Sequence, residues 1–365
     1  MKITGLESIA LAIPFSHGGK DGGFRGQDWS KIYTVLLRLE TTEGVTGWGE
    51  AFGYGTSKAV KGILEELIAP LVLNREIDDI AVFMRDIAQV LHIFGRNGAI
   101  QYALSALDIG LWDVKAKLAG LPLHALIGGA GRSSLPAYAS LFKYGDAETV
   151  AAMSQRSLDE GFKQIKLHET GFREIESARK AVGAHIPIMV DVNCPWTPEQ
   201  AIKAAKEMRD LDIYWLEEPV FPPEDFKALA QCQKLGGIKI GAGENACGVS
   251  EFEKMLDLGA VSFAQPSVTK VGGISTFLAV DALCRERGTP VYPHSAYFGP
   301  GLLATLHLVA ARPDPTLVEW FKLELEHDLF NGKVSPKNGS FAMPTGPGLG
   351  LDPDPAVIRT YRVPI

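Results

Sequence analysis

The chain has 365 residues, which is long for one ordinary globular domain and suits two. Hydrophobic residues make up 46% of the chain and charged residues 22%, so there is enough apolar material for a large core and wholesale disorder is excluded. The 36 basic and 43 acidic side chains give a net charge of −7, which argues against a surface for nucleic acid or for an anionic membrane.

Cysteine usage and hydropathy indicate the compartment. The four cysteines form no Cys-x-x-Cys pair, which favours reduced thiols over a disulfide framework. The apolar stretch at 9–15 is short and has only Lys2 as a basic residue before it, so it is a better first strand than a signal peptide. No stretch approaches the roughly 18 uninterrupted apolar residues of a membrane span. We therefore expect a cytoplasmic protein without a membrane partner.

The first third of the chain mixes strands with helices. Residues 33–40 alternate and are rich in β-formers, 41–44 form a turn, and 45–50 return, so this segment predicts an antiparallel hairpin. Helical patterns follow at about 57–70, 76–94 and 99–118, the last of them stopping at Gly120 before Pro122. We interpret residues 1–125 as an α+β domain.

From about residue 135, short apolar strands alternate with amphipathic helices. A polar residue ends each apolar run, and successive markers are 23 to 27 residues apart: Ser140, Lys166, Asp191, Glu217, Glu244, Ser267, His294 and Glu319. Eight such units predict a (β/α) barrel over residues 126–330, with the tail at 331–365 folding back onto the first domain. A doubly wound open sheet is the alternative, which the absence of a Gly-x-Gly-x-x-Gly loop disfavours.

Three of the markers are carboxylates on consecutive strands. In a (β/α) barrel the C-terminal ends of the strands face the active site, so Asp191, Glu217 and Glu244 are expected side by side in one mouth. Three clustered carboxylates repel one another unless a cation neutralises them, and oxygen ligands suit Mg²⁺. Isolated acids in salt bridges are the alternative for any one of them, but three in succession favour a metal site.

Candidate acid–base groups flank this cluster in the sequence. Lys166 and His168 are two residues apart, which places both side chains on the same inward face of a strand. His294 comes from a later strand across the mouth, although a lone histidine is as often a satisfied core residue. A metal with bases on two sides suits the removal of a proton from a carbon acid.

With these residues the chain resembles the enolase superfamily, specifically its mandelate racemase-like branch, over essentially its whole length. The matching stretches are 44–50, 105–113, 120–122, 126–129, 190–193, 215–219, 243–245, 265–266, 270–273 and 293–294. The resemblance implies an α+β capping domain over a (β/α)₇β barrel, with Mg²⁺ on Asp191, Glu217 and Glu244. It also implies chemistry that begins with removal of the proton α to a carboxylate.

Two positions depart from the pattern of that branch. The strand that usually reads Lys-x-Lys has His168 in place of the second lysine, and the aspartate usually paired with the next strand's histidine is Ser267. In the muconate-lactonising branch the latter position is lysine, so serine fits neither pattern. We expect His294 to be less basic without a carboxylate partner. His168 becomes a candidate base, with Lys166 beside it to neutralise the substrate carboxylate.

Specificity is expected from the capping domain and the barrel mouth. Residues 16–26 contain five glycines, which is typical of a polar lid, and His17 and Arg25 are its candidates for contacting a hydroxylated acid. Asn193, Trp196 and Glu319 are predicted to line the mouth.

The predicted function is dehydration of a sugar acid to a 2-keto-3-deoxy acid, with His294 as the general acid that helps expel the β-hydroxyl. The alternatives are a racemase or epimerase, a cycloisomerase that uses the same enediolate chemistry, and a non-catalytic metal-dependent binder of organic acids. We also expect a homo-oligomer that acts on a small hydroxy-carboxylate and binds no nucleic acid.

Overall fold

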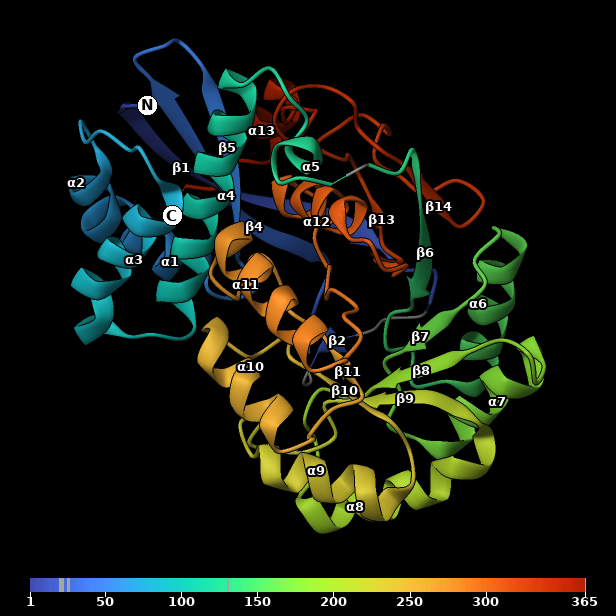
Figure 1. Ribbon diagram of the computed structural model, residues 1–365. Helices are drawn as coiled ribbons and strands as arrows, with labels where there is room; N and C mark the ends of the chain where they lie inside the picture. The colour runs from blue at the N-terminus through green and yellow to red at the C-terminus, as the bar shows by residue number, and fades with distance from the viewer. Residues whose placement is uncertain (20–22, 25–26, 130, 365) are drawn as a thin grey trace.

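The computed structural model describes residues 1–19, 23–24, 27–129 and 131–364. The chain forms a capping lobe around an antiparallel sheet and a larger lobe in which strands are surrounded by helices (Figure 1). In the capping lobe, β1 (Ile3–Ser16) pairs with β4 (Lys31–Thr41), which pairs with β5 (Thr46–Phe52), and the predicted hairpin is confirmed. The short strands β2 (Gly23–Phe24) and β3 (Gln27–Asp28) pair with each other.

Helices cover one face of the capping sheet. They are α1 (Ser57–Gly62), a π-helical turn (Ile63–Ile68), α2 (Ala69–Val72), α3 (Ile80–Leu91), a 3₁₀ turn (His92–Phe94) and α4 (Ala99–Leu118). Helix α4 lies directly on β5, and a Cβ atom at Gly49 would come within 1.9 Å of the Ala106 carbonyl oxygen. Only glycine permits this approach, so Gly49 sets the distance between the helix and the sheet.

Seven parallel strands and one bridged segment form the barrel. The strands are β6 (Ser134–Ser140), β7 (Ile165–Leu167), β8 (Ile188–Asp191), β9 (Ile213–Glu217), β10 (Ile240–Ala242), β11 (Phe263–Ala264) and β12 (Val318–Phe321). Each pairs with the next from β6 to β11, and β12 pairs back to β6. Between β11 and β12, residues 291–294 form the eighth position through the parallel bridges Ala264–Val291 and Ser267–His294. The predicted barrel is confirmed, and the open-sheet alternative is wrong.

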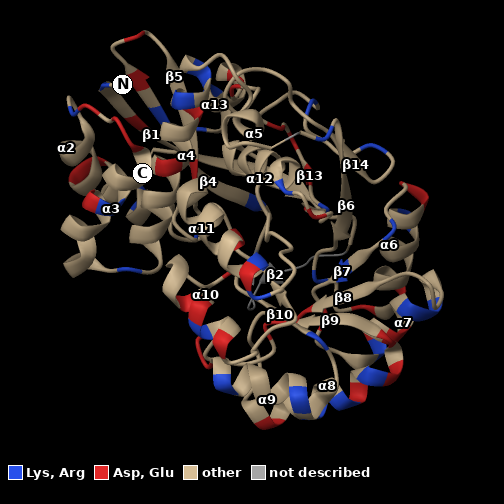
Figure 2. Cartoon of the chain, viewed as in Figure 1, with Lys and Arg blue, Asp and Glu red and all other residues tan. Residues whose placement is uncertain are grey.

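Seven helices connect the eight barrel positions. They are α6 (Ala147–Asp159), α7 (Phe172–Val182), α8 (Pro198–Met208), α9 (Phe226–Gly236), α10 (Gly248–Asp257), α11 (Gly273–Glu286) and α12 (Pro300–Ala311). A 3₁₀ turn (Arg209–Leu211) follows α8. Charges of both signs lie along α7, α8 and α9 (Figure 2), as expected for helices that bury only one face. None of the helices in the described part of the chain is long and apolar enough to cross a membrane.

The C-terminal part of the chain returns to the capping lobe. After β12, β13 (Glu324–Leu325) pairs with β1, β14 (Ser340–Ala342) pairs with β6, and α13 (Pro355–Tyr361) follows. The backbone N–H of Val363 donates to the Ala10 carbonyl of β1, and that of Leu349 donates to Asp113 of α4. The predicted (β/α)₇β barrel with a capping domain completed by the tail is confirmed. The division of the chain at residues 125 and 330 stays a prediction.

Buried carboxylates of the capping lobe cap two barrel helices. Three of the seven barrel helices, α6, α8 and α9, carry a side-chain cap of their own: Thr197 and Gln200, for example, form a reciprocal capping box at the start of α8. Helices α11 and α12 follow glycines and have no side-chain cap of their own. Asp108 of α4 instead accepts from the Ser275 N–H of α11 at 2.9 Å, and Glu50 of β5 accepts from the Gly301 N–H of α12 at 2.7 Å.

Side chains on one polar face of α4 form hydrogen bonds with the start of α11. Gln101 donates to the Val271 carbonyl, Ser105 accepts from the Gly272 N–H, and Trp112 donates to the Ser275 hydroxyl. Together with Asp108 these side chains recur at helical spacing, so they form a single stripe along α4. The stripe fixes the loop between β11 and α11, which carries residues of the barrel mouth.

The capping carboxylates make the stability of the protein depend on pH. Burial raises the pKa of Glu50 to about 7, and the hydrogen bonds from Thr34, Gly301 and Gly299 only partly offset it. A pKa higher in the folded than in the unfolded state means that this group's stabilising contribution falls as pH rises from about 4.5 to about 7. Glu50→Gln keeps an acceptor but cannot ionise.

We therefore expect the melting temperature of Glu50→Gln minus that of the wild type to increase as the pH is raised from 5 to 8. Scanning calorimetry measures both melting temperatures. Glu207→Gln, at an exposed acid of α8, is the matched control and should show no such trend. A constant difference between Glu50→Gln and wild type across this range would contradict the assignment of Glu50 as the titrating cap.

Candidate active site

The three predicted carboxylates meet at the C-terminal ends of β8, β9 and β10. Asp191 and Glu217 are the last residues of their strands, and Glu244 follows β10 by two residues. One carboxylate oxygen from each lies within 4.8 Å of the others. Asp191 and Glu217 are fully buried, and Glu244 is partly exposed. A cluster of three oxygen donors with one face open could hold a divalent metal ion.

Hydrogen bonds from the protein hold the individual carboxylates in place. The indole N–H of Trp215 donates to Glu217 at 2.9 Å, and the backbone N–H of Asn193 donates to Asp191 at 3.0 Å. Burial raises the pKa of Glu217 to about 8, to which the nearby charge of Asp191 adds, although Lys166 opposes it. A cation among the three oxygens would favour the charged form and reverse this shift.

Lys166 is a fully buried cation beside the cluster. Its Nζ lies 3.3 Å from Asp191, 3.0 Å from Glu217 and 2.7 Å from Glu319. Burial lowers the pKa of Lys166, but the three carboxylates outweigh this effect and raise the pKa well above its ordinary value. The lysine is therefore held as an ammonium ion by carboxylates from three different strands.

His168 lies two residues after Lys166, directly after the end of β7, and faces the same site. Its Nδ1 contacts the Leu141 carbonyl, which makes Nδ1 the donor and leaves Nε2 directed to Asp191 at 3.3 Å. Burial lowers the pKa of His168, but the Asp191 carboxylate outweighs burial and raises it above the ordinary value. The side chain is 17% exposed, whereas that of Lys166 has no exposed surface.

His294 contacts the opposite end of the carboxylate cluster. Its Nε2 lies 3.1 Å from Glu244, and its Nδ1 lies 3.2 Å from Ser267 and 3.1 Å from the Tyr297 hydroxyl. Burial lowers the pKa of His294, and the pull of Glu244 and Glu319 in the other direction is too weak to restore it. Lys166 and His168 thus approach the cluster from the Asp191 side and His294 from the Glu244 side.

Glu319 connects the two sides. It lies on β12, accepts from Lys166 and from the backbone N–H of Ser295, and is 1% exposed. Burial raises the pKa of Glu319, but the ammonium of Lys166 and the adjacent His294 outweigh it and lower the pKa to about 2. Glu319 therefore remains a carboxylate that bridges Lys166 to the segment following His294.

The other residues predicted to contact the substrate lie in different surroundings. The Asn193 backbone contacts Asp191, but Trp196 is part of a bridge to Val220 and its side chain packs on the barrel core. The His17 ring stacks on Phe142 with centroids 4.3 Å apart. Arg25 lies outside the described residues.

Aromatic side chains from both lobes enclose the His168 side of the mouth. Phe321 lies 5.8 Å from the His168 ring and stacks on Phe142, while Trp29 contacts Phe142 at 5.6 Å and Tyr54 at 5.3 Å. Phe142 and Phe321 are buried. The part of residues 16–26 that is described is thus joined to an aromatic wall, whereas the sequence predicted only a polar lid.

Sequence reasoning missed a second buried lysine. Nζ of Lys270 lies 3.3 Å from Glu244 and 2.9 Å from the side-chain oxygen of Asn245, and the Asn245 amide donates to Glu218 at 2.7 Å. Lys270 fell within a motif of the resemblance, but no periodicity or strand end marked it, because it lies in the loop after β11. It balances Glu244 as Lys166 balances Asp191.

Two family models match the chain. The model for the mandelate racemase and muconate lactonizing enzyme N-terminal domain matches residues 28–128, and the enolase C-terminal domain-like model matches residues 148–357. The chain belongs to the enolase superfamily, in its mandelate racemase-like branch. The family identified from the sequence motifs is confirmed.

Named members of this family are similar over nearly the whole chain. The L-talarate/galactarate dehydratase of Salmonella typhimurium is 30% identical, over 95% of this chain and 86% of its own length. The D-galactarolactone cycloisomerase of Agrobacterium fabrum is 29% identical over 100% of both chains. A crystal structure of a racemase from Streptomyces coelicolor with bound magnesium superposes with a TM-score of 0.87 at 25% identity, covering 99% of this chain and 100% of that one.

Proposed function

We propose that this enzyme dehydrates a hydroxylated sugar acid to a 2-keto-3-deoxy acid with Mg²⁺ as cofactor. The observation that carries the proposal is the arrangement of acid–base groups around one carboxylate cluster. Lys166 and His168 contact it at Asp191, and His294 contacts it at Glu244. A substrate held at the cluster therefore meets proton-transferring groups on two sides, which is what removal of an α-proton and loss of a β-hydroxyl require.

The cluster fits Mg²⁺ because its donors are all carboxylate oxygens and carry enough charge for a divalent ion. Asp191, Glu217 and Glu244 would hold the ion. When bound, Mg²⁺ stabilises the negative charge that develops on the substrate carboxylate as the α-proton leaves.

We assign removal of the α-proton to His168. The Leu141 carbonyl fixes its Nδ1 as the donor, so Nε2 is the nitrogen directed into the site. Lys166 is engaged by three carboxylates and supplies positive charge next to the substrate carboxylate. As the C–H bond breaks, its electron pair forms the carbon–carbon double bond.

Protonated His294 donates from Nε2 to the β-hydroxyl as the carbon–oxygen bond breaks, so that this group leaves as water and His294 becomes neutral. The enol that remains tautomerises to the 2-keto-3-deoxy acid. Glu319 fixes the position of Lys166 relative to the segment following His294 through its contacts with Lys166 and Ser295.

The test is incubation of the Mg²⁺-loaded enzyme with a panel of aldonic and aldaric acids in ²H₂O. We expect at least one acid to yield a 2-keto-3-deoxy product, detected as its semicarbazone and by NMR. Solvent deuterium at Cα with no keto product for every acid in the panel would contradict dehydration and identify a racemase or epimerase.

A cycloisomerase is the second candidate, favoured by two observations. The Agrobacterium fabrum relative is named a D-galactarolactone cycloisomerase and matches end to end. The aromatic wall around Phe142 and Phe321 also suits the apolar face of a ring. Adding sugar-acid lactones to the same panel separates the two, because a cycloisomerase opens the ring without releasing water. The non-catalytic binder is set aside, since the relatives are enzymes; the homo-oligomer and the cytoplasmic location remain proposals.

A further inference from the structure

The histidine on the Glu244 side has an unusual partner. The branch pattern places an aspartate at position 267, and this chain has a serine there. In the structure two hydroxyls take the aspartate's place: the Ser267 hydroxyl and the Tyr297 hydroxyl both face Nδ1 of His294, at 3.2 Å and 3.1 Å. The two hydroxyls also hydrogen-bond each other. All three side chains are buried, at 0%, 3% and 6% exposed for Ser267, Tyr297 and His294.

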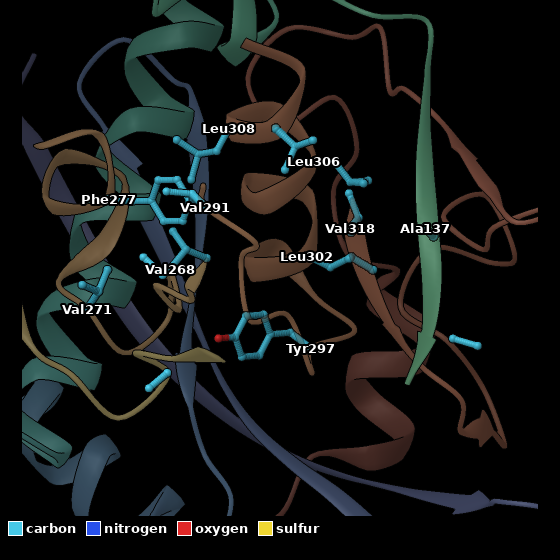
Figure 3. Close-up of a cluster of buried hydrophobic side chains, with 14 of the residues drawn as sticks. Ala137, Val268, Val271, Phe277, Val291, Tyr297, Leu302, Leu306, Leu308 and Val318 are labelled. Carbon is cyan, nitrogen blue, oxygen red and sulfur yellow. The ribbon is translucent and has the colours of Figure 1, made fainter. Parts of the chain in front are cut away.

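The fold determines where the Tyr297 hydroxyl lies. The ring packs among apolar side chains of the barrel, and Figure 3 shows its hydroxyl directed away from Leu302. The ring meets His294 edge-on, with centroids 5.7 Å apart. On either side of Tyr297, the Tyr54 hydroxyl donates to the Ala296 carbonyl and Glu50 accepts from Gly301. The capping lobe therefore holds the segment that presents Tyr297.

Ser267 is fixed independently of this segment. It follows β11 and forms a parallel bridge with His294, so the two side chains lie next to each other on neighbouring barrel positions. The backbone N–H groups of Lys270 and Val271 donate to the Ser267 carbonyl. The two hydroxyls thus reach Nδ1 from different segments, one from the barrel and one from the loop under the capping lobe.

The chemistry of a hydroxyl differs from that of a carboxylate in one respect. A carboxylate only accepts, so it selects the imidazole form with hydrogen on Nδ1 and a lone pair on Nε2. A hydroxyl can donate to Nδ1 or accept from it, so a pair of hydroxyls can hold the ring in either protonation state. With Nδ1 held in this way, Nε2 is the nitrogen on the Glu244 side, 3.1 Å from that carboxylate.

We propose that Ser267 and Tyr297 are positioning residues that together hold the His294 ring by its Nδ1, with Nε2 directed into the site. The inference rests on the proposed function, because it concerns the group that donates to the departing hydroxyl. It assigns to Tyr297 a role that no motif in the sequence indicates. It also explains how the site keeps an oriented histidine without the aspartate of the branch pattern.

The kinetic test removes the hydroxyls one at a time. Net loss of one hydrogen bond corresponds to roughly a threefold to tenfold effect. We expect Tyr297→Phe and Ser267→Ala each to lower kcat for keto product by about that factor, with KM little changed. The double variant should lose about 10- to 100-fold, the product of the two effects, and approach His294→Asn. Exchange of the α-proton with ²H₂O should persist in all of them, because it uses the His168 side.

The matched control is Tyr292→Phe. Tyr292 lies two residues before His294, and its hydroxyl contacts Tyr214 instead of the site. It should keep wild-type kinetics. Ser267→Ala is the smaller change and keeps the test usable if Tyr297→Phe does not fold, which thermal melting reports. A double variant that retains product formation within about twofold of wild type would overturn the proposal.

A spectroscopic readout is independent of turnover. With ¹⁵N-labelled histidine, His294 is assigned as the signal missing from His294→Asn, and its two nitrogen shifts report the hydrogen bonding of each nitrogen. We expect the Nδ1 shift to change in the double variant by more than the Nε2 shift. An Nδ1 shift that is the same in the wild type and the double variant would overturn the proposal. If no sugar acid is turned over, the proposed function fails and this spectrum still decides the role of the two hydroxyls.

Discussion

Replacing Asp191, Glu217 or Glu244 with the corresponding amide is expected to remove most of the affinity for Mg²⁺, and the activity with it. Each substitution removes one full charge from the cluster of three carboxylates that we propose holds the ion. Outer partners that only orient a metal ligand already cost about 10–100-fold when lost, so we expect a ligand itself to cost roughly 100-fold or more. Calorimetric titration with Mg²⁺ measures the affinity, and keto product formation measures the activity.

The fold of these variants is expected to survive. An amide has nearly the shape of the carboxylate, and it relieves repulsion in a buried cluster in which the pKa of Glu217 is already raised to about 8. Glu207→Gln, at an exposed acid on α8, serves as the control for a lost charge and should bind Mg²⁺ as wild type does. Three amide variants that all bind Mg²⁺ with wild-type affinity would place the metal site elsewhere in the chain.

The positions of the three clustered carboxylates could be predicted because the barrel topology dictates them. A (β/α) unit has a nearly fixed length, so a polar residue at each strand end recurs at a regular interval and the ends of consecutive strands must lie side by side. Asp191 and Glu217 are indeed the last residues of β8 and β9. The same logic placed Lys166, in β7, and His168, directly after it, on one face.

Contacts made by loops and contacts between the two lobes could not be predicted from the sequence pattern. Tyr297 and Lys270 lie in segments without periodicity, and their roles depend on where a loop folds over the mouth. Asp108 and Glu50 look like ordinary acids of a helix and a strand, yet they cap helices of the other lobe. The His17 prediction named a residue of the mouth region but not its partner, the Phe142 ring, because stacking depends on side-chain orientation in three dimensions.

The second large effect on activity is expected when His168, the proposed general base, is replaced. If His168 removes the α-proton, His168→Gln should abolish exchange of that proton with ²H₂O and lower kcat by about 10²–10⁴-fold, the usual contribution of a general base. Affinity for Mg²⁺ should stay near the wild-type value, because the three carboxylates are intact. His168→Lys, which restores the residue of the branch pattern, should recover part of the exchange.

Lys166→Met separates the two candidates for the base. It leaves Asp191, Glu217 and Glu319 without their shared cation, so we expect a lower melting temperature and a raised KM as well as a lower kcat. His168→Gln should lack the KM and stability effects, because His168 makes only one contact to that cluster. The opposite result, with exchange near wild type in His168→Gln and none in Lys166→Met, would make Lys166 the base. His168 would then act by orienting Asp191. Removal of the α-proton would still take place on the Asp191 side of the carboxylate cluster, and loss of the hydroxyl on the Glu244 side.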